Sequence, residues 1–69
     1  MNEHTQAVLR WIDTDLDLLW HAQWTVSHMD LFDAAETLAA VDWEEYDDNI
    51  DRSEVDWDAV VEHLTGGES

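Results

Sequence analysis

The sequence predicts an all-α fold, a compact bundle of three or four helices that forms one domain over residues 1–69. Three observations support this prediction. There is no proline, and the only glycines are Gly66 and Gly67, so no helix-breaking residue occurs before the end of the chain. Apolar residues recur at intervals of three and four, and no segment shows the strict alternation of a half-buried strand. At 69 residues the chain has room for one domain only.

The first helical segment is expected over residues 3–28. Its apolar side chains cover about twice the arc that a helix needs to pack on a small core. Thr14 lies between two aspartates and can cap a new helix, so one long helix and two helices with a break near 13–14 are both open. The surplus apolar side chains are expected to form an interface. The candidate interface residues are Trp11, Leu18, Trp20 and Trp24.

Three shorter helices are expected after this segment, over residues 31–41, 43–50 and 54–64, with a tail over 65–69. Asp30, Asp42 and Ser53 precede them as N-caps. Whether the helix over 43–50 is separate or continues the one before it is left open. Gly66 suits the left-handed residue that ends a helix. The last helix places one apolar stripe on the core, and its expected anchors are Trp57, Val60, Val61 and Leu64.

The charge balance is extreme. Eighteen acidic residues face two arginines and no lysine, which gives a formal net charge of −16. Such a charge opposes a compact state by self-repulsion, yet 45% of the residues are hydrophobic, too many for a typical disordered acidic segment. Molar salt screens surface charges beyond about 3 Å. The composition therefore resembles that of proteins from salt-accumulating halophilic archaea, and folding is expected to require salt.

This composition argues against several classes of function. Direct binding to nucleic acid or to an anionic membrane needs basic residues, and the chain has only two. Its longest uncharged stretch, 18–29, is too short to span a bilayer, and no leader sequence is recognisable, so a cytoplasmic location is expected. Without cysteine there are no disulfides or thiolate metal sites. No nucleophile motif or phosphate loop occurs, so neither an enzyme nor a cofactor is expected.

Two acidic patterns could instead bind a partner or a cation. The segment 42–58 holds nine acids and one arginine with aromatic residues between them; it is either a docking surface or a solvated face over ordinary core positions. The same segment partly matches a calcium loop, but Arg52 stands where glycine is needed. On the first segment, Asp17, His21 and His28 share a helix face and could hold a divalent ion. Solvated side chains are the simpler interpretation of both patterns.

The function expected from these observations is a small protein-interaction or regulatory module. It would self-associate as a homodimer, dock on a protein partner, or do both, through apolar, tryptophan-rich helix faces, because apolar contacts persist in salt while charge-driven contacts weaken. The alternative is an acidic mimic of nucleic acid that occupies the basic groove of a DNA- or RNA-binding protein. A divalent-metal-binding domain ranks third.

Overall fold

The computed structural model describes residues 2–66, and within them it contains helices and no strand. The α-helices are α1 (Glu3–Thr14), α2 (Leu16–His28), α3 (Leu31–Ala39), α4 (Trp43–Tyr46) and α5 (Trp57–Thr65), and a 3-10 turn, η1, covers Arg52–Glu54. The predicted all-α bundle is confirmed, with four longer helices and the single turn of α4. Of the expected tail, residues 67–69 lie outside the described residues, as does Met1.

The first expected segment is two helices, and they separate at Asp15. This residue is extended (φ −102°, ψ 110°), and its carboxylate accepts hydrogen bonds from the main-chain N–H groups of Asp17 and Leu18 at 3.1 and 3.2 Å. Thr14, the cap considered from the sequence, does not cap α2. Its hydroxyl donates back to the main-chain oxygen of Arg10. Of the two possibilities left open, the one with a break is observed, and the break lies at Asp15, next to the expected position near 13–14. The Asp15 side chain can accept from two N–H groups at once.

The last helix begins three residues later than predicted. Asp56, and not Ser53, is its N-cap, with its carboxylate 3.2 Å from the main-chain nitrogen of Ala59. Residues 52–54 form only a 3-10 turn, and Val55 after it is extended. At the other end, Gly66 adopts the left-handed conformation (φ 69°), as the sequence predicted.

The middle helices are shorter than expected and are separate. Helix α3 ends at Ala39, and α4 covers four residues where eight were expected. After Tyr46, the Asp47 carboxylate accepts a hydrogen bond from the main-chain nitrogen of Asn49 at 2.9 Å. This side-chain turn competes with helical hydrogen bonding and ends α4.

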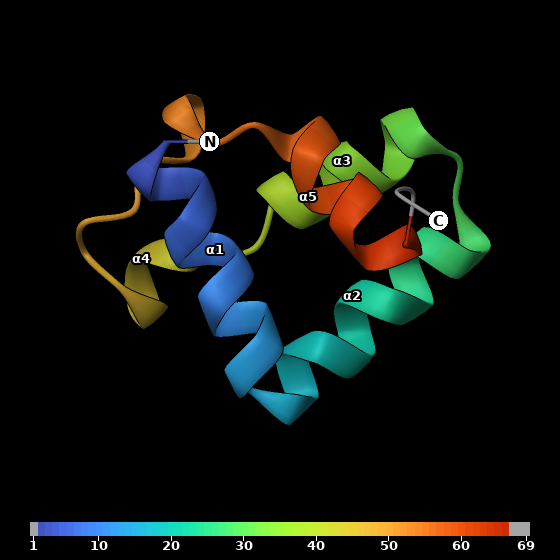
Figure 1. The fold of residues 1–69 in the computed structure, drawn as a ribbon, viewed down its shortest axis with the longest axis horizontal. Coiled ribbons are helices and arrows are strands. Elements are labelled where there is room, and N and C mark those ends of the chain that lie inside the picture. The colour runs from blue at the N-terminus through green and yellow to red at the C-terminus, as the bar shows by residue number, and fades with distance from the viewer. Residues whose placement is uncertain (1, 67–69) are drawn as a thin grey trace.

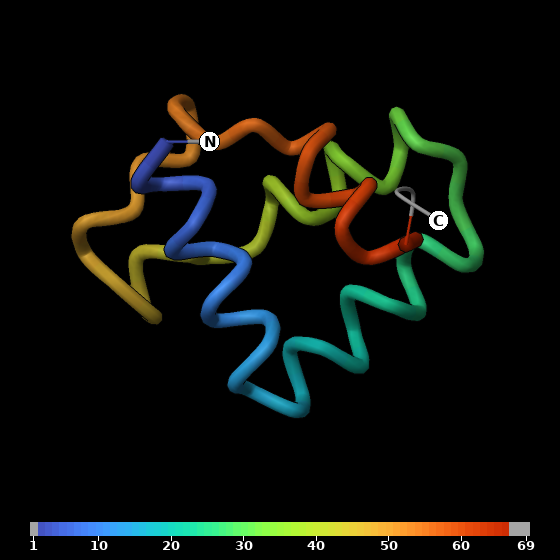
Figure 2. Tube along the Cα trace, in the orientation of Figure 1, coloured from blue at the N-terminus to red at the C-terminus, as the bar shows by residue number. Residues whose placement is uncertain are grey.

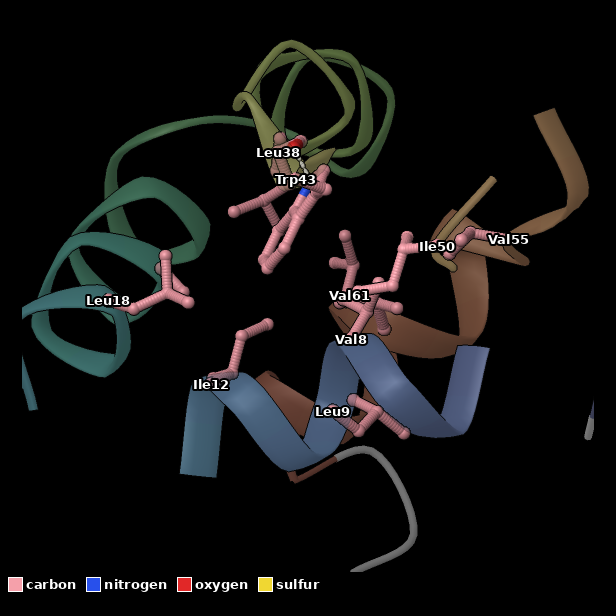
Figure 3. Packing of buried hydrophobic residues seen from close by; sticks show 12 residues of the cluster. Val8, Leu9, Ile12, Leu18, Leu38, Trp43, Ile50, Val55 and Val61 are labelled. Atoms are coloured by element: carbon pink, nitrogen blue, oxygen red, sulfur yellow. Dashed lines mark hydrogen bonds between the residues drawn. The ribbon is translucent and has the colours of Figure 1, made fainter. Parts of the chain in front are cut away.

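The longer helices enclose one core. In Figure 1, α1 and α2 diverge from their junction as a V, and α3 and α5 lie across its open end. Helix α5 packs against α1, α2 and α3, and α2 also packs against α3. Side chains from every α-helix and from the loops on both sides of η1 meet between them (Figure 3). The buried apolar residues are Val8, Leu9, Ile12, Leu18, Ala22, Ala34, Leu38, Trp43, Ile50, Val55, Val60 and Val61.

Trp43 is the largest fully buried side chain of this core. Figure 3 shows its indole pointing from below Leu38 toward the space between α1 and α2. Two of the expected anchors, Val60 and Val61, are buried with it, whereas Trp57 and Leu64 are half-buried and pack against the rim. The central tryptophan thus belongs to the short helix α4. The regular apolar stripe of α5 supplies the smaller side chains of Val60 and Val61 around it.

Candidate protein-interaction surface

Six large hydrophobic side chains are exposed among the described residues, and three of them lie on α2. These are Leu16, Trp20 and Trp24, exposed to 78%, 69% and 43%. They are four residues apart, so they follow one another along a single ridge of the helix. We call this row the α2 stripe. The other three are Leu31 and Phe32 at the start of α3 and Tyr46 at the end of α4.

The α2 stripe is exposed because the opposite side of α2 already packs on the core. That side presents Leu18, Ala22 and Thr25, all buried, at roughly 160° from the stripe around the helix axis. Thr25 can be buried because its hydroxyl donates to the main-chain oxygen of His21 at 2.8 Å. With one face of α2 turned to the core, Trp20 and Trp24 lie on the outer side and keep 69% and 43% of their surface exposed.

The four candidate interface residues do not form one surface. Leu18 was expected there but is 5% exposed and belongs to the core, because the break at Asp15 rotates the start of α2 relative to α1. Trp11 is half-buried on α1, with its ring centroid 5.5 Å from that of Tyr46. Only Trp20 and Trp24 lie on the free face. Leu16 was not among the expected interface residues, although its spacing of four from Trp20 is visible in the sequence.

The same helix is nearly free of charge. Asp17 is its one acidic residue and it has no arginine, so seventeen of the eighteen acids of the chain lie outside α2. The other exposed polar residues of α2 are His21, Gln23, Ser27 and His28. An apolar ridge therefore lies within a face of low charge on a strongly acidic molecule. Exposed apolar surface bordered by polar side chains is typical of interaction sites.

Trp24 is held in place by its neighbour one turn later. The imidazole of His28 stacks on the indole, with centroids 4.3 Å apart and the planes at 14°. The Nδ1–H of His28 donates to the main-chain oxygen of Trp24 at 2.8 Å, which fixes the imidazole over the indole. A side chain that is already ordered loses less conformational entropy when a partner binds.

The acidic segment 42–58 differs from the α2 stripe both in its charge and in the exposure of its apolar side chains. Of its five aromatic and aliphatic residues, Trp43, Ile50 and Val55 are buried, while Trp57 is half-buried and Tyr46 is exposed at 36%. Its carboxylates are exposed, apart from half-buried Asp47. Of the two interpretations of this segment, the structure favours a solvated acidic face over core positions. An acidic-aromatic docking surface would need these apolar side chains on the outside.

The acidic segment is also attached to the first turn of α1. Figure 2 shows it returning past the N-terminal end of that helix. The Asn2 side-chain amide donates to the main-chain oxygen of Glu54 at 2.6 Å, and the main-chain nitrogen of Asp51 donates to Nδ1 of His4 at 3.1 Å. The main-chain nitrogen of Asp56 donates to the hydroxyl of buried Thr5 at 2.9 Å. These bonds hold a segment that has little regular structure of its own.

Within the acidic segment, Asp51 is engaged by its own loop. The Ser53 hydroxyl donates to the Asp51 carboxylate at 2.6 Å and the Ser53 main-chain nitrogen at 3.0 Å. These two bonds lower the pKa of Asp51 below its ordinary value. In the partial calcium loop, which would start at Asp47, Asp51 stands at the fifth position and would be a ligand. Here its carboxylate caps the η1 turn instead.

No three His, Asp or Glu side chains within residues 2–66 come together in a way that could hold a metal ion. This applies to the partial calcium loop and to the helix face of Asp17, His21 and His28. His28 is instead stacked on Trp24. The two histidines outside α2 each have an acidic neighbour: His4 is bonded to the Asp51 main chain, and Nε2 of His63 is 3.5 Å from the carboxylate of Asp13.

The chain matches no known protein family, no characterised protein and no solved structure. Its function therefore has to follow from its own surface chemistry. Across residues 2–66, none of the helices has the length and apolar character needed to cross a membrane.

Proposed function

We propose that this protein is a small interaction module that works in high salt, in the cytoplasm, and engages another protein through the α2 stripe. The observation that carries the proposal is the exposure of Leu16, Trp20 and Trp24 on a helix with a single acidic residue. Tryptophan is enriched among the residues that dominate binding energy at interfaces. Its exposure to water is costly unless a partner covers it for part of the protein's working cycle.

The salt environment supports an apolar docking mode. A chain of charge −16 is expected to tolerate concentrated salt, in which contacts between charged surfaces are largely screened. Salts that are excluded from protein surfaces leave apolar association intact or strengthen it. The α2 stripe offers this kind of contact, and α2 has one carboxylate that a partner would have to desolvate or neutralise.

Mimicry of nucleic acid is the alternative, and it would use the carboxylates outside α2. The exposed acids of the segment 42–58 support it, because they form a negative surface that is held to α1. Binding of this kind depends on long-range attraction and weakens steeply as salt rises. Salt dependence therefore distinguishes the two functions.

The proposal is tested by affinity capture from a native lysate in molar KCl. The bait is the wild-type chain, a Trp20→Gln/Trp24→Gln variant, or a Phe32→Gln variant. Phe32 is 72% exposed but lies on α3, so the last variant controls for loss of an exposed aromatic side chain. We expect a specific protein to be retained by the wild type and by Phe32→Gln and lost with the double variant.

Two results would count against docking through α2. One is the same set of proteins on all three baits. The other is capture at low salt that disappears in molar KCl for every bait, which would favour the acidic mimic. Circular dichroism of each bait in the capture buffer ensures that folded proteins are compared.

A further inference from the structure

We infer that the occupant of the α2 stripe is a second copy of this chain, joined by two antiparallel α2 helices about a two-fold axis. This inference rests on the proposed function, because it names the partner of the same surface. It follows from three features of the molecule: the distribution of charge, the symmetry of the stripe and the area that the stripe offers.

The charge distribution determines which faces of two copies can meet. Each copy carries a net −16, but only one of its acids, Asp17, lies on α2. Each of the other four α-helices carries two acids, and α1 also has Arg10. A contact between two copies of any of them therefore brings twice as many carboxylates together as a contact through α2, which costs energy even in moderate salt. Among the described α-helices, α2 is thus the one through which two identical acidic chains bring the fewest carboxylates together.

The stripe is complementary to itself when one copy is reversed. Leu16, Trp20, Trp24 and His28 are evenly spaced, and their centre coincides with the middle of α2 at Ala22. A two-fold axis at the level of Ala22 brings Trp20 of each copy against Trp24 of the other. It also brings Leu16 of each copy against His28 of the other. Rows spaced by four residues pack with the helices crossed by about 50°, and a two-fold contact uses the same patch on both copies.

The area is sufficient for a reversible dimer. At about 250 Å² for a whole tryptophan side chain, the two exposed indoles of one copy present on the order of 280 Å². With Leu16, His28 and the polar side chains between them, one face offers roughly 500–600 Å², so two faces reach the roughly 1,000 Å² that a specific interface needs. This is near the lower limit, and we expect dissociation in the micromolar range.

The mass of the protein in molar KCl tests whether the second copy binds. We expect sedimentation velocity to show a dimer at about 100 µM that dissociates on dilution. Trp20→Glu brings one new carboxylate from each copy close to the symmetry axis. The two carboxylates repel each other, so this variant should be a monomer at every concentration. Phe32→Glu makes the same change in charge on α3 and should leave the dimer intact. Circular dichroism confirms that each variant is folded.

Disulfide crosslinking tests the orientation, because the chain has no native cysteine. Gln23 and Ser27 are both exposed on the side of α2 that carries the stripe. In the antiparallel pair, Gln23→Cys lies beside the axis and should crosslink to its own copy. Ser27→Cys should not, because the two positions are about 15 Å apart along the helices, far beyond disulfide reach. A parallel pair would crosslink at both positions.

Each contrary outcome has a distinct meaning. A monomer at 100 µM, with Trp20 and Trp24 still needed to capture a different protein, overturns the second copy and leaves the proposed function standing. A monomer without such capture overturns both. If Phe32→Glu dissociates the dimer as fully as Trp20→Glu does, the dimer uses another face and the inference is wrong. If Ser27→Cys crosslinks as efficiently as Gln23→Cys, the helices are not antiparallel.

Discussion

The indole nitrogen of Trp43 donates a hydrogen bond of 2.9 Å to the main-chain oxygen of Leu38. Leu38 is in the last turn of α3, and its main-chain oxygen also accepts a hydrogen bond from the main-chain nitrogen of Val41 at 3.2 Å. Trp43 therefore bonds to the C-terminal end of α3 and fills the centre of the core with the same side chain. Its ring also lies near Tyr46 and Trp57, with centroids at 5.8 and 5.9 Å.

This double role predicts that Trp43 is the tryptophan on which folding depends most. Truncating a fully buried tryptophan to alanine costs about 3–5 kcal/mol, comparable with the whole stability of a small domain. We expect Trp43→Ala to lose its cooperative thermal transition in molar KCl. Trp57→Ala, at a half-buried site, should remain folded with a lowered melting temperature, and equal losses in the two variants would contradict this ranking.

The hydrogen bond of Trp43 can be tested separately. Trp43→Phe keeps an aromatic ring but removes the donor to Leu38, which leaves a carbonyl oxygen at the end of α3 without this partner. We expect a folded protein that is destabilised by about 1–3 kcal/mol, from the lost bond and the smaller ring together. A melting temperature equal to that of the wild type would show that the bond contributes nothing.

The contribution of Asp15 to stability as an N-cap can be separated from the effect of its negative charge. Asp15→Ala removes both, and loss of such a cap typically costs about 1 kcal/mol. Asp15→Asn keeps a capping oxygen without the charge and should melt close to the wild type. Asp48→Ala removes a charge from an exposed position that caps no helix, and it measures the gain from reduced repulsion alone. If Asp15→Ala behaves like Asp48→Ala, the break between α1 and α2 does not depend on this cap.

The Asp51–Ser53 pair makes a prediction about pH. Because the hydrogen bonds from Ser53 lower the pKa of Asp51 in the folded state, they contribute stability above the ordinary pKa of an aspartate. That contribution is lost as the pH falls through the lowered pKa. In Ser53→Ala, the pKa of Asp51 should move up toward its ordinary value. Titration of the Asp51 carboxyl carbon by NMR in wild type and variant measures the shift; identical curves would contradict the assignment.

Folding should depend on salt. At low ionic strength the carboxylates repel one another over about 30 Å, the size of the whole molecule, and at 1 M salt over only about 3 Å. We therefore expect helical circular dichroism and a cooperative melt in molar KCl, both weakened in dilute buffer. The same melting temperature in the two buffers would contradict an adaptation to high salt.

The sequence alone was enough to predict the all-α class, the separation of acidic and apolar side chains, and the left-handed Gly66. These features arise from local effects: helical spacing, the absence of proline and internal glycine, and one residue's backbone preference. Helix boundaries were predicted less well, because several aspartates and serines in succession can each act as a cap. Asp15 and Asp56 were chosen over Thr14 and Ser53 by the hydrogen bonds and packing around them.

The roles of the five tryptophans were decided only by the tertiary structure. Their spacing shows which of them share a helix face, but not whether that face meets the core or solvent. Trp43 is buried, although its helix is a single turn, because its indole lies among core side chains from α1, α2, α3 and α5. Trp20 and Trp24 remain outside, because Leu18, Ala22 and Thr25 already occupy the core side of α2. A core of this size is filled from one side of each helix, and which side is a property of the assembled bundle.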